Sequence, residues 1–216
     1  MSLQRVLTAN NRADLFIDIA ELASGSMLVG FLWTHMLFVG TVLIGPDIFN
    51  TVPKTLEAYF LAQIGIPFVI LLILAHMILA GRRIPNRFGD MKIVWRHTRT
   101  LGHWDTWTWL FQVATGGAIG ILAAAHIWTV VSHWDINLQV SSGRVAQSPY
   151  FVFYILLLLL GEYHAGVGLY RQAVKWGWLS RKKVSWVLNA VTLLIIVLGM
   201  AALLVIKSNA VIGGGA

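Results

Sequence analysis

Four histidines lie deep within long apolar stretches of the sequence, one in each of four stretches: His35, His76, His126 and His164. An imidazole in hydrocarbon is costly unless its ring nitrogens are hydrogen-bonded, paired or bound to a metal. Four such residues in a chain of 216 therefore indicate a ligand. Imidazole is a common axial ligand of haem iron, and two haems with two imidazoles each would use all four side chains.

The elements that must carry these histidines are membrane-spanning helices. Apolar residue types make up 57% of the chain and charged types only 12%, whereas a soluble domain has about 25% charged residues. A helix needs about 20 apolar residues to cross the hydrocarbon of a bilayer. The connecting segments leave no room for a soluble domain, so we expect a single all-α integral membrane domain over residues 1–216. Five segments qualify as spans, at about 20–45, 62–81, 106–133, 149–173 and 186–207.

The absence of cysteine from the sequence limits the redox chemistry. It excludes cysteine-ligated iron–sulfur clusters, thioether-attached haem and disulfides. The amino-terminal stretch has no short apolar core followed by a small-residue cleavage site, so we expect no removable signal peptide.

The basic residues predict the orientation in the membrane, because cytoplasmic loops carry an excess of lysine and arginine. Only Lys54, Arg144 and Lys207 lie on the side opposite the amino terminus. We therefore expect a multi-pass protein of the cytoplasmic (inner) membrane with its amino terminus inside and its carboxyl terminus outside. Topology also accounts for the high pI, so nucleic-acid binding is not expected. The thirteen basic residues on the amino-terminal side are Arg5, Arg12, Arg82, Arg83, Arg87, Lys92, Arg96, Arg99, Arg171, Lys175, Arg181, Lys182 and Lys183.

The depth of each histidine along its span sorts the four into two pairs. At 1.5 Å per residue, His35 and His126 lie about 15 and 10 Å from the outer ends of their spans, and we call them the outer pair. His76 and His164 lie about 20 Å or more from the outside, and we call them the inner pair. One haem held by each pair would give five helices bundled around two stacked b haems. Bis-histidine ligation fills both axial positions, which favours electron transfer over gas binding.

Other interpretations of the histidines stay open at this point. A histidine in a span can simply hydrogen-bond to a neighbouring helix, and a non-redox channel or transporter could use histidines to carry protons or metal ions. A single four-histidine zinc or copper centre is opposed by the difference in depth of about 10 Å. Small residues near the histidines serve either close helix packing or a flat macrocycle. Three histidines at or beyond span ends are left out of the ligand set: His97, His103 and His133.

Several stretches resemble the dihaem cytochrome b subunit of quinol:fumarate reductases and related succinate:quinone oxidoreductases. They include THMLFVGTVLIG, LAHMILAGRRIP, TGGAIGILAAAHIW and GEYHAGVGLYRQAVKWGW. The resemblance extends from about residue 23 to about residue 199, with the histidines in the same order on the same spans. It implies that the outer haem takes its ligands from spans one and three and the inner haem from spans two and four, which are the pairs that depth also indicates.

Two glutamates are candidates for proton transfer. Glu162 precedes His164 by two residues inside an apolar span, where a carboxylate must be neutral or have a partner, so a proton carrier beside the haems is expected. The resemblance matches it to a family glutamate thought to conduct protons across the membrane, while a structural hydrogen bond is the alternative.

Glu57 follows span one at the outer surface, where a solvated loop charge is the ordinary interpretation. The resemblance matches it to a glutamate needed for menaquinol oxidation, which implies that Glu57 accepts a quinol proton.

Haem propionates are anionic and need donors. Lys175 and Trp109 match family residues that bind the propionates of the inner haem, and Arg144 is a candidate at the outer haem. On the residues alone, Lys175 is one of several basic groups after span four, and Trp109 could belong to an interfacial aromatic belt.

Together the residues and the resemblance predict the quinone-reactive membrane anchor of a quinol:fumarate reductase. Menaquinol would be oxidised near the outer face, and electrons would pass through two haem b groups to an iron–sulfur subunit, which would serve a flavoprotein subunit on the cytoplasmic side. Proton transfer through Glu162 would balance the charge, and the chain has no dicarboxylate site of its own. Alternatives are a succinate dehydrogenase anchor working in the opposite direction and a dihaem anchor of another quinone-linked oxidoreductase. Whether the complex dimerises stays open.

Overall fold

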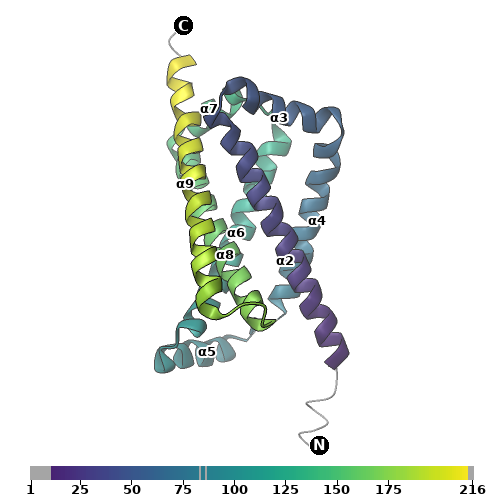
Figure 1. The fold of residues 1–216 in the computed structure, drawn as a ribbon, viewed down its shortest axis with the longest axis vertical. Coiled ribbons are helices and arrows are strands. Elements are labelled where there is room, and N and C mark those ends of the chain that lie inside the picture. Colours follow the sequence, from purple (N-terminus) through teal and green to yellow (C-terminus); the bar gives the residue numbers. More distant parts are fainter. Residues whose placement is uncertain (1–10, 83, 86, 214–216) are drawn as a thin grey trace, which may run out of the picture.

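The computed structural model describes residues 11–82, 84–85 and 87–213, and every regular element within these ranges is a helix (Figure 1). Five helices are long and apolar enough to cross a membrane, which confirms the predicted all-α fold with five spans. Arg5 and Arg83 of the predicted basic side lie outside the described residues. The five long helices are α2 (Asn11–Gly40), α4 (Leu61–Gly81), α6 (Trp104–Ser132), α8 (Ser148–Lys175) and α9 (Arg181–Gly213).

The predicted spans agree with these helices to within a few residues, except in the first and last spans. The first span was expected from about residue 20, whereas α2 is already helical at Asn11. The last was expected over about 186–207, whereas α9 runs from Arg181 to Gly213. In both places the helix continues beyond the apolar core into polar residues, which hydropathy alone does not include in a span.

The connecting segments are themselves largely helical, which the sequence analysis did not predict. They form η1 (Thr41–Leu43), α3 (Pro46–Ala58), α5 (Phe88–Leu101) and α7 (Leu138–Val145). The start of α3 has a proline in its first turn, and Asn137 caps α7 by accepting the Val140 N–H at 2.9 Å. Figure 1 shows α3 and α7 near the carboxyl terminus and α5 near the amino terminus. We call these the carboxyl-terminal and amino-terminal ends of the bundle.

Helix α9 packs closely on α7 and α8. A Cβ atom built on Gly199 of α9 would lie 2.7 Å from the Met36 side chain and 2.8 Å from that of Leu158. A larger residue here would force the Met36 and Leu158 side chains to move, so glycine favours the close approach of α9 to α2 and α8. A buried apolar cluster extends this contact toward the carboxyl-terminal end, comprising Val42, Phe49, Leu138, Val145, Leu158, Ala202, Leu203 and Ile206.

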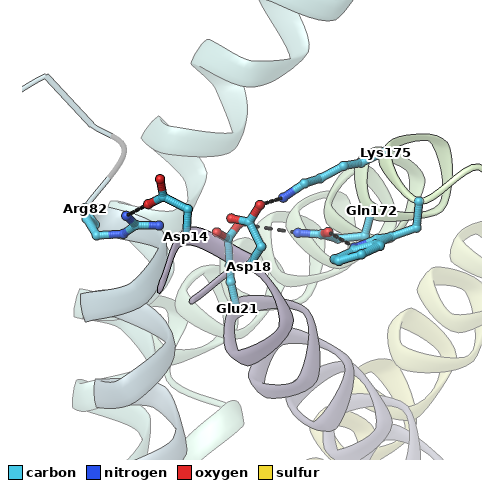
Figure 2. A network of polar contacts seen from close by, with 7 residues as sticks. Asp14, Asp18, Glu21, Arg82, Gln172 and Lys175 are labelled. Atoms are coloured by element: carbon cyan, nitrogen blue, oxygen red, sulfur yellow. Dashed lines mark hydrogen bonds and ion pairs between the residues drawn. The ribbon is translucent and has the colours of Figure 1, made fainter. Parts of the chain in front are cut away.

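Charged side chains join α2 to α4 and α8 at the amino-terminal end (Figure 2). Asp14, Asp18 and Glu21 are spaced four and three residues apart, so they share one face of α2, and we call them the α2 acidic row. Asp14 Oδ1 lies 3.2 Å from the guanidinium of Arg82 at the end of α4. On the other side, Asp18 Oδ2 lies 2.7 Å from Lys175 Nζ. Gln172 of α8 also donates to Glu21 Oε1 at 3.4 Å. The row thus connects the first span to both helices that carry the inner pair.

Candidate functional site

A cavity of about 1390 Å³ runs along the bundle, and all four predicted histidines line it. Pockets for small molecules commonly measure about 300–1000 Å³, so this space exceeds what one small ligand needs. Glu21 and Lys175 line it toward the amino-terminal end, and Arg144 and Asp135 line it toward the other end. The cavity therefore extends over much of the length of the spans.

The outer pair meets across this cavity. The ring centroids of His35 on α2 and His126 on α6 are 6.0 Å apart, with their planes inclined by 59°. With metal–nitrogen bonds of about 2 Å, two imidazoles on opposite sides of one metal ion would have their centroids at a similar separation. Aromatic rings position both histidines. Phe31 stacks on His35 at 5.7 Å, and Tyr154 meets His126 edge-on at 5.7 Å. The Nδ1 atom of His126 is buried and has no hydrogen-bond partner among the described residues.

The inner pair lies nearer the amino-terminal end and is positioned by hydroxyl groups. His76 Nδ1 on α4 lies 3.1 Å from Ser24 Oγ on α2. His164 Nδ1 on α8 lies 3.2 Å from Thr115 Oγ1 on α6. Each histidine of the inner pair therefore contacts a hydroxyl group of a neighbouring helix through its Nδ1 atom.

Glycines stand directly against the two inner rings. A Cβ atom on Gly25 would lie 3.1 Å from Cε1 of His76, and a Cβ atom on Gly116 would lie 3.0 Å from Cε1 of His164. Ordinary side chains would crowd the rings at both positions, so the glycines leave the imidazoles room beside their neighbouring helices. From the sequence, small residues were expected to serve helix packing or a macrocycle, whereas at these two positions the glycine leaves room for the imidazole itself.

The cavity suits a flat apolar group with anionic edges, which is the chemistry of haem. Its walls are mainly apolar, four imidazoles reach it from four helices, and basic side chains line both of its ends. The described residues include no group of three or more His, Cys, Asp or Glu side chains that could hold a bare metal ion.

The three residues matched to haem propionates all line the cavity. Lys175 and Trp109 line it with Glu21 near the amino-terminal end, and Arg144 lines it from α7. The structure adds a partner that the sequence analysis missed, because Lys175 forms an ion pair with Asp18. Of the three histidines set aside, His133 also lines the cavity, which its position at a span end did not predict. His103 instead caps α6 by accepting the Asp105 N–H at 3.3 Å.

Glu162 is completely buried, with an exposed fraction of 0%. Neither of its carboxyl oxygens has a hydrogen-bond partner in the described part of the chain. The Trp33 indole nitrogen lies near this carboxyl group from α2 without meeting hydrogen-bond geometry. Two residues of α-helix turn about 200°, so Glu162 points away from the side of α8 that carries His164. The carboxyl group accordingly lies beside the cavity rather than in its wall.

Glu57 is exposed near the end of α3, at the carboxyl-terminal end of the bundle. The indole nitrogen of Trp134 donates a hydrogen bond to Glu57 Oε1 at 2.9 Å. Both residues line a small hollow of about 80 Å³, which shares Pro53 and Asp135 with the large cavity and so adjoins it. Trp134 was not identified from the sequence, since no spacing rule relates residues 77 positions apart.

Curated relatives of the chain carry a common description. The fumarate reductase cytochrome b subunit of Helicobacter pylori is 32% identical over 199 residues, covering 85% of this chain and 77% of the relative. The subunit of the same description from Wolinella succinogenes is 33% identical over 173 residues, covering 76% of this chain and 68% of the relative. No family model matches the chain.

Proposed function

The chain belongs to the family of fumarate reductase cytochrome b subunits, and from this premise we propose that it holds two b haems and carries electrons from menaquinol to an iron–sulfur subunit. The observation that carries the proposal is the single cavity lined by all four histidines, in which the rings of His35 and His126 are 6.0 Å apart. The bound haems would supply one-electron transfer between a two-electron quinol and a chain of iron–sulfur centres.

The histidines divide into an axial pair for each haem. His35 and His126 would hold the outer iron from α2 and α6, and His76 and His164 would hold the inner iron from α4 and α8. This assignment is supported by the contact within the outer pair and by the shared cavity. Lys175 and Trp109 would neutralise and bind the propionates of the inner haem, and Arg144 those of the outer haem.

Quinol oxidation takes place at the carboxyl-terminal end, beside the outer pair. Oxidation of a quinol releases two protons with its two electrons, so a base must stand at the site. Glu57 takes this role, because it is exposed and lines a hollow that adjoins the large cavity. The hydrogen bond from Trp134 fixes the direction of its carboxylate while leaving one oxygen for the quinol hydroxyl.

The amino-terminal end faces the cytoplasm and the partner subunits. Basic residues gather at this end on α5 and on the segment that begins α9, in keeping with the positive-inside rule. An iron–sulfur subunit docked here would receive electrons from the inner haem, and a flavoprotein subunit would reduce fumarate. Because protons leave outside while electrons move inward, Glu162 returns protons inward and keeps the overall reaction electrically neutral.

The experiment that tests this function is a visible spectrum of the complex purified with all its subunits. We expect sharp reduced bands of low-spin haem b and a ratio of two haems per copy of this chain, measured as pyridine haemochrome. The complex should also couple menaquinol oxidation to fumarate reduction. A colourless complex would reject the proposal and favour a non-redox transporter.

The role of Glu57 can be tested by Glu57→Gln, which keeps the hydrogen bond from Trp134 but removes the proton acceptor. We expect menaquinol-dependent fumarate reduction to fall on the order of 10²-fold, the size of effect typical of a general base. Haem content and fumarate reduction from an artificial dye that feeds the partner subunits should not change. Asp47→Asn is the matched control, because Asp47 is exposed on the same helix and lines neither cavity. Equal losses in both variants would speak against a specific role.

A further inference from the structure

The two histidine pairs are held in chemically different ways. Aromatic rings contact the outer pair, and the buried Nδ1 atom of His126 has no hydrogen-bond partner among the described residues. Hydroxyl groups contact both members of the inner pair at Nδ1, at 3.1 Å for His76 and 3.2 Å for His164. The outer and inner pairs therefore differ in the hydrogen bonding of Nδ1, the ring nitrogen that would not bind iron.

The other hydrogen bonds of the two hydroxyl groups indicate which nitrogen carries the proton. Ser24 Oγ donates to the carbonyl of Glu21 at 3.1 Å, and Thr115 Oγ1 donates to the carbonyl of Phe111 at 2.7 Å. A hydroxyl has one proton, so after this donation it can only accept from the histidine. This arrangement favours the tautomers in which the Nδ1–H groups of His76 and His164 donate to Ser24 and Thr115.

A second contact fixes the same tautomer for His164. The side-chain amide nitrogen of Gln112 lies 3.4 Å from Nε2 of His164 and donates to the His164 carbonyl at 3.0 Å. An amide nitrogen donates but does not accept, so at this contact Nε2 is the accepting nitrogen, and the proton of the neutral ring is on Nδ1. Nε2 is the nitrogen that would bind iron once Nδ1 is protonated.

The same pair of residue types occurs on both supporting helices. Ser24 is followed by Gly25 on α2, and Thr115 is followed by Gly116 on α6. In each case the hydroxyl contacts Nδ1 of the histidine, and the glycine leaves space at Cε1 of the same ring. We call each of these a hydroxyl–glycine pair. Helices α2 and α6 thus orient an imidazole in the same way, with a hydroxyl group at Nδ1 and a glycine at Cε1.

We infer that Ser24 and Thr115 are positioning residues of the inner haem, which hold its two axial histidines as Nδ1–H tautomers and make them stronger electron donors to the iron. This inference rests on the proposed ligation by the inner pair. A hydrogen bond from the distal N–H of a ligating histidine fixes the ring orientation and raises the basicity of the ligand. A more basic imidazole stabilises the ferric state, so the two hydroxyls lower the reduction potential of the inner haem.

The test is a redox titration of the intact purified complex carrying Ser24→Ala, Thr115→Val or both. We expect both haems to remain bound and the midpoint potential of one haem to shift to more positive values, with the largest shift in the double variant. The potential of the other haem should not change. Repeating the titration in a His126→Ala background, where only the inner haem would remain, identifies the haem that shifts.

Conservative variants separate the hydroxyl from the packing around it. Ser24→Thr and Thr115→Ser keep a hydroxyl and should keep the parental potential. The same two variants should also retain the inner haem if Ser24→Ala or Thr115→Val loses it. Thr129→Val is the matched control, because Thr129 donates to the Ala125 carbonyl of its own helix and does not line the cavity. Its potentials should equal those of the parent complex.

Several results would overturn the inference. These are unchanged potentials in the double variant, a shift confined to the outer haem, an equal shift in Thr129→Val, or loss of the inner haem from the hydroxyl-retaining variants. If the parent complex contains no haem, the proposed function fails and this inference fails with it. If the parent complex holds two haems and their midpoint potentials are the same in the Ser24 and Thr115 variants, only this inference fails.

Discussion

Replacing His126 by alanine is expected to lower the haem content of the purified complex from two haems to one per copy of this chain. His126 and His35 would bind the same iron from α6 and α2, so loss of one imidazole leaves that iron with a single protein ligand. The inner pair comes from α4 and α8 and should keep its haem. Pyridine haemochrome assays would measure the ratio, and a redox titration would show one midpoint in place of two.

The complementary variant His164→Ala should remove the inner haem instead. The one midpoint potential that remains should be that of the outer haem, which is the midpoint lost in His126→Ala. The control is His103→Ala, which removes an imidazole from the start of α6 without touching the cavity. That variant should retain both haems. The pairing would be contradicted if His126→Ala retained two haems, or if His126→Ala and His164→Ala left the same haem behind.

Glu162→Gln is expected to leave both haems in place and to abolish most quinol-linked turnover. The carboxyl group is fully buried and no described residue gives it a hydrogen bond, so the amide fits the same space. Glutamine cannot take up and release a proton, and we expect menaquinol-dependent fumarate reduction to fall on the order of 10²-fold. The measurement is turnover of the complex reconstituted in sealed vesicles, compared with turnover from an artificial dye that bypasses this chain.

The spectrum of the Glu162→Gln complex serves as its own structural control, because His164 is two residues away on the same helix. Unchanged reduced bands with lost turnover would assign the defect to proton transfer. Glu162→Asp keeps an ionisable group and should retain part of the activity. Normal quinol-linked turnover in Glu162→Gln would remove this residue from the proton path.

The main features of the fold were predictable because a bilayer restricts the choice of structure. Five apolar segments of sufficient length predict five helices, and the structure has them. The grouping of His35 with His126 followed from depth alone, since a helix rises by a constant amount per residue. The rotation of each helix about its axis does not follow from depth. For that reason the hydroxyls of Ser24 and Thr115 were not identified as neighbours of the inner pair.

Contacts between distant connectors were likewise beyond prediction. The hydrogen bond from Trp134 to Glu57 depends on how α3 and the segment before α7 lie at the carboxyl-terminal end. The α2 acidic row is a different case, because the spacing of Asp14, Asp18 and Glu21 predicts a single charged face on the first span. That spacing would have indicated basic or amide partners, although not that they come from α4 and α8.

The α2 acidic row also has a consequence for biosynthesis. Gln172 follows Glu21 by 151 residues, and at about 5–20 residues per second the ribosome needs on the order of 10 s to make that stretch. Until then, α8 with its lysine does not exist, and carboxylates on a newly inserted segment are strongly drawn to water. Asp14 can pair with Arg82 as soon as α4 is made, whereas Asp18 and Glu21 should keep their water until the fourth segment emerges and supplies Lys175 and Gln172.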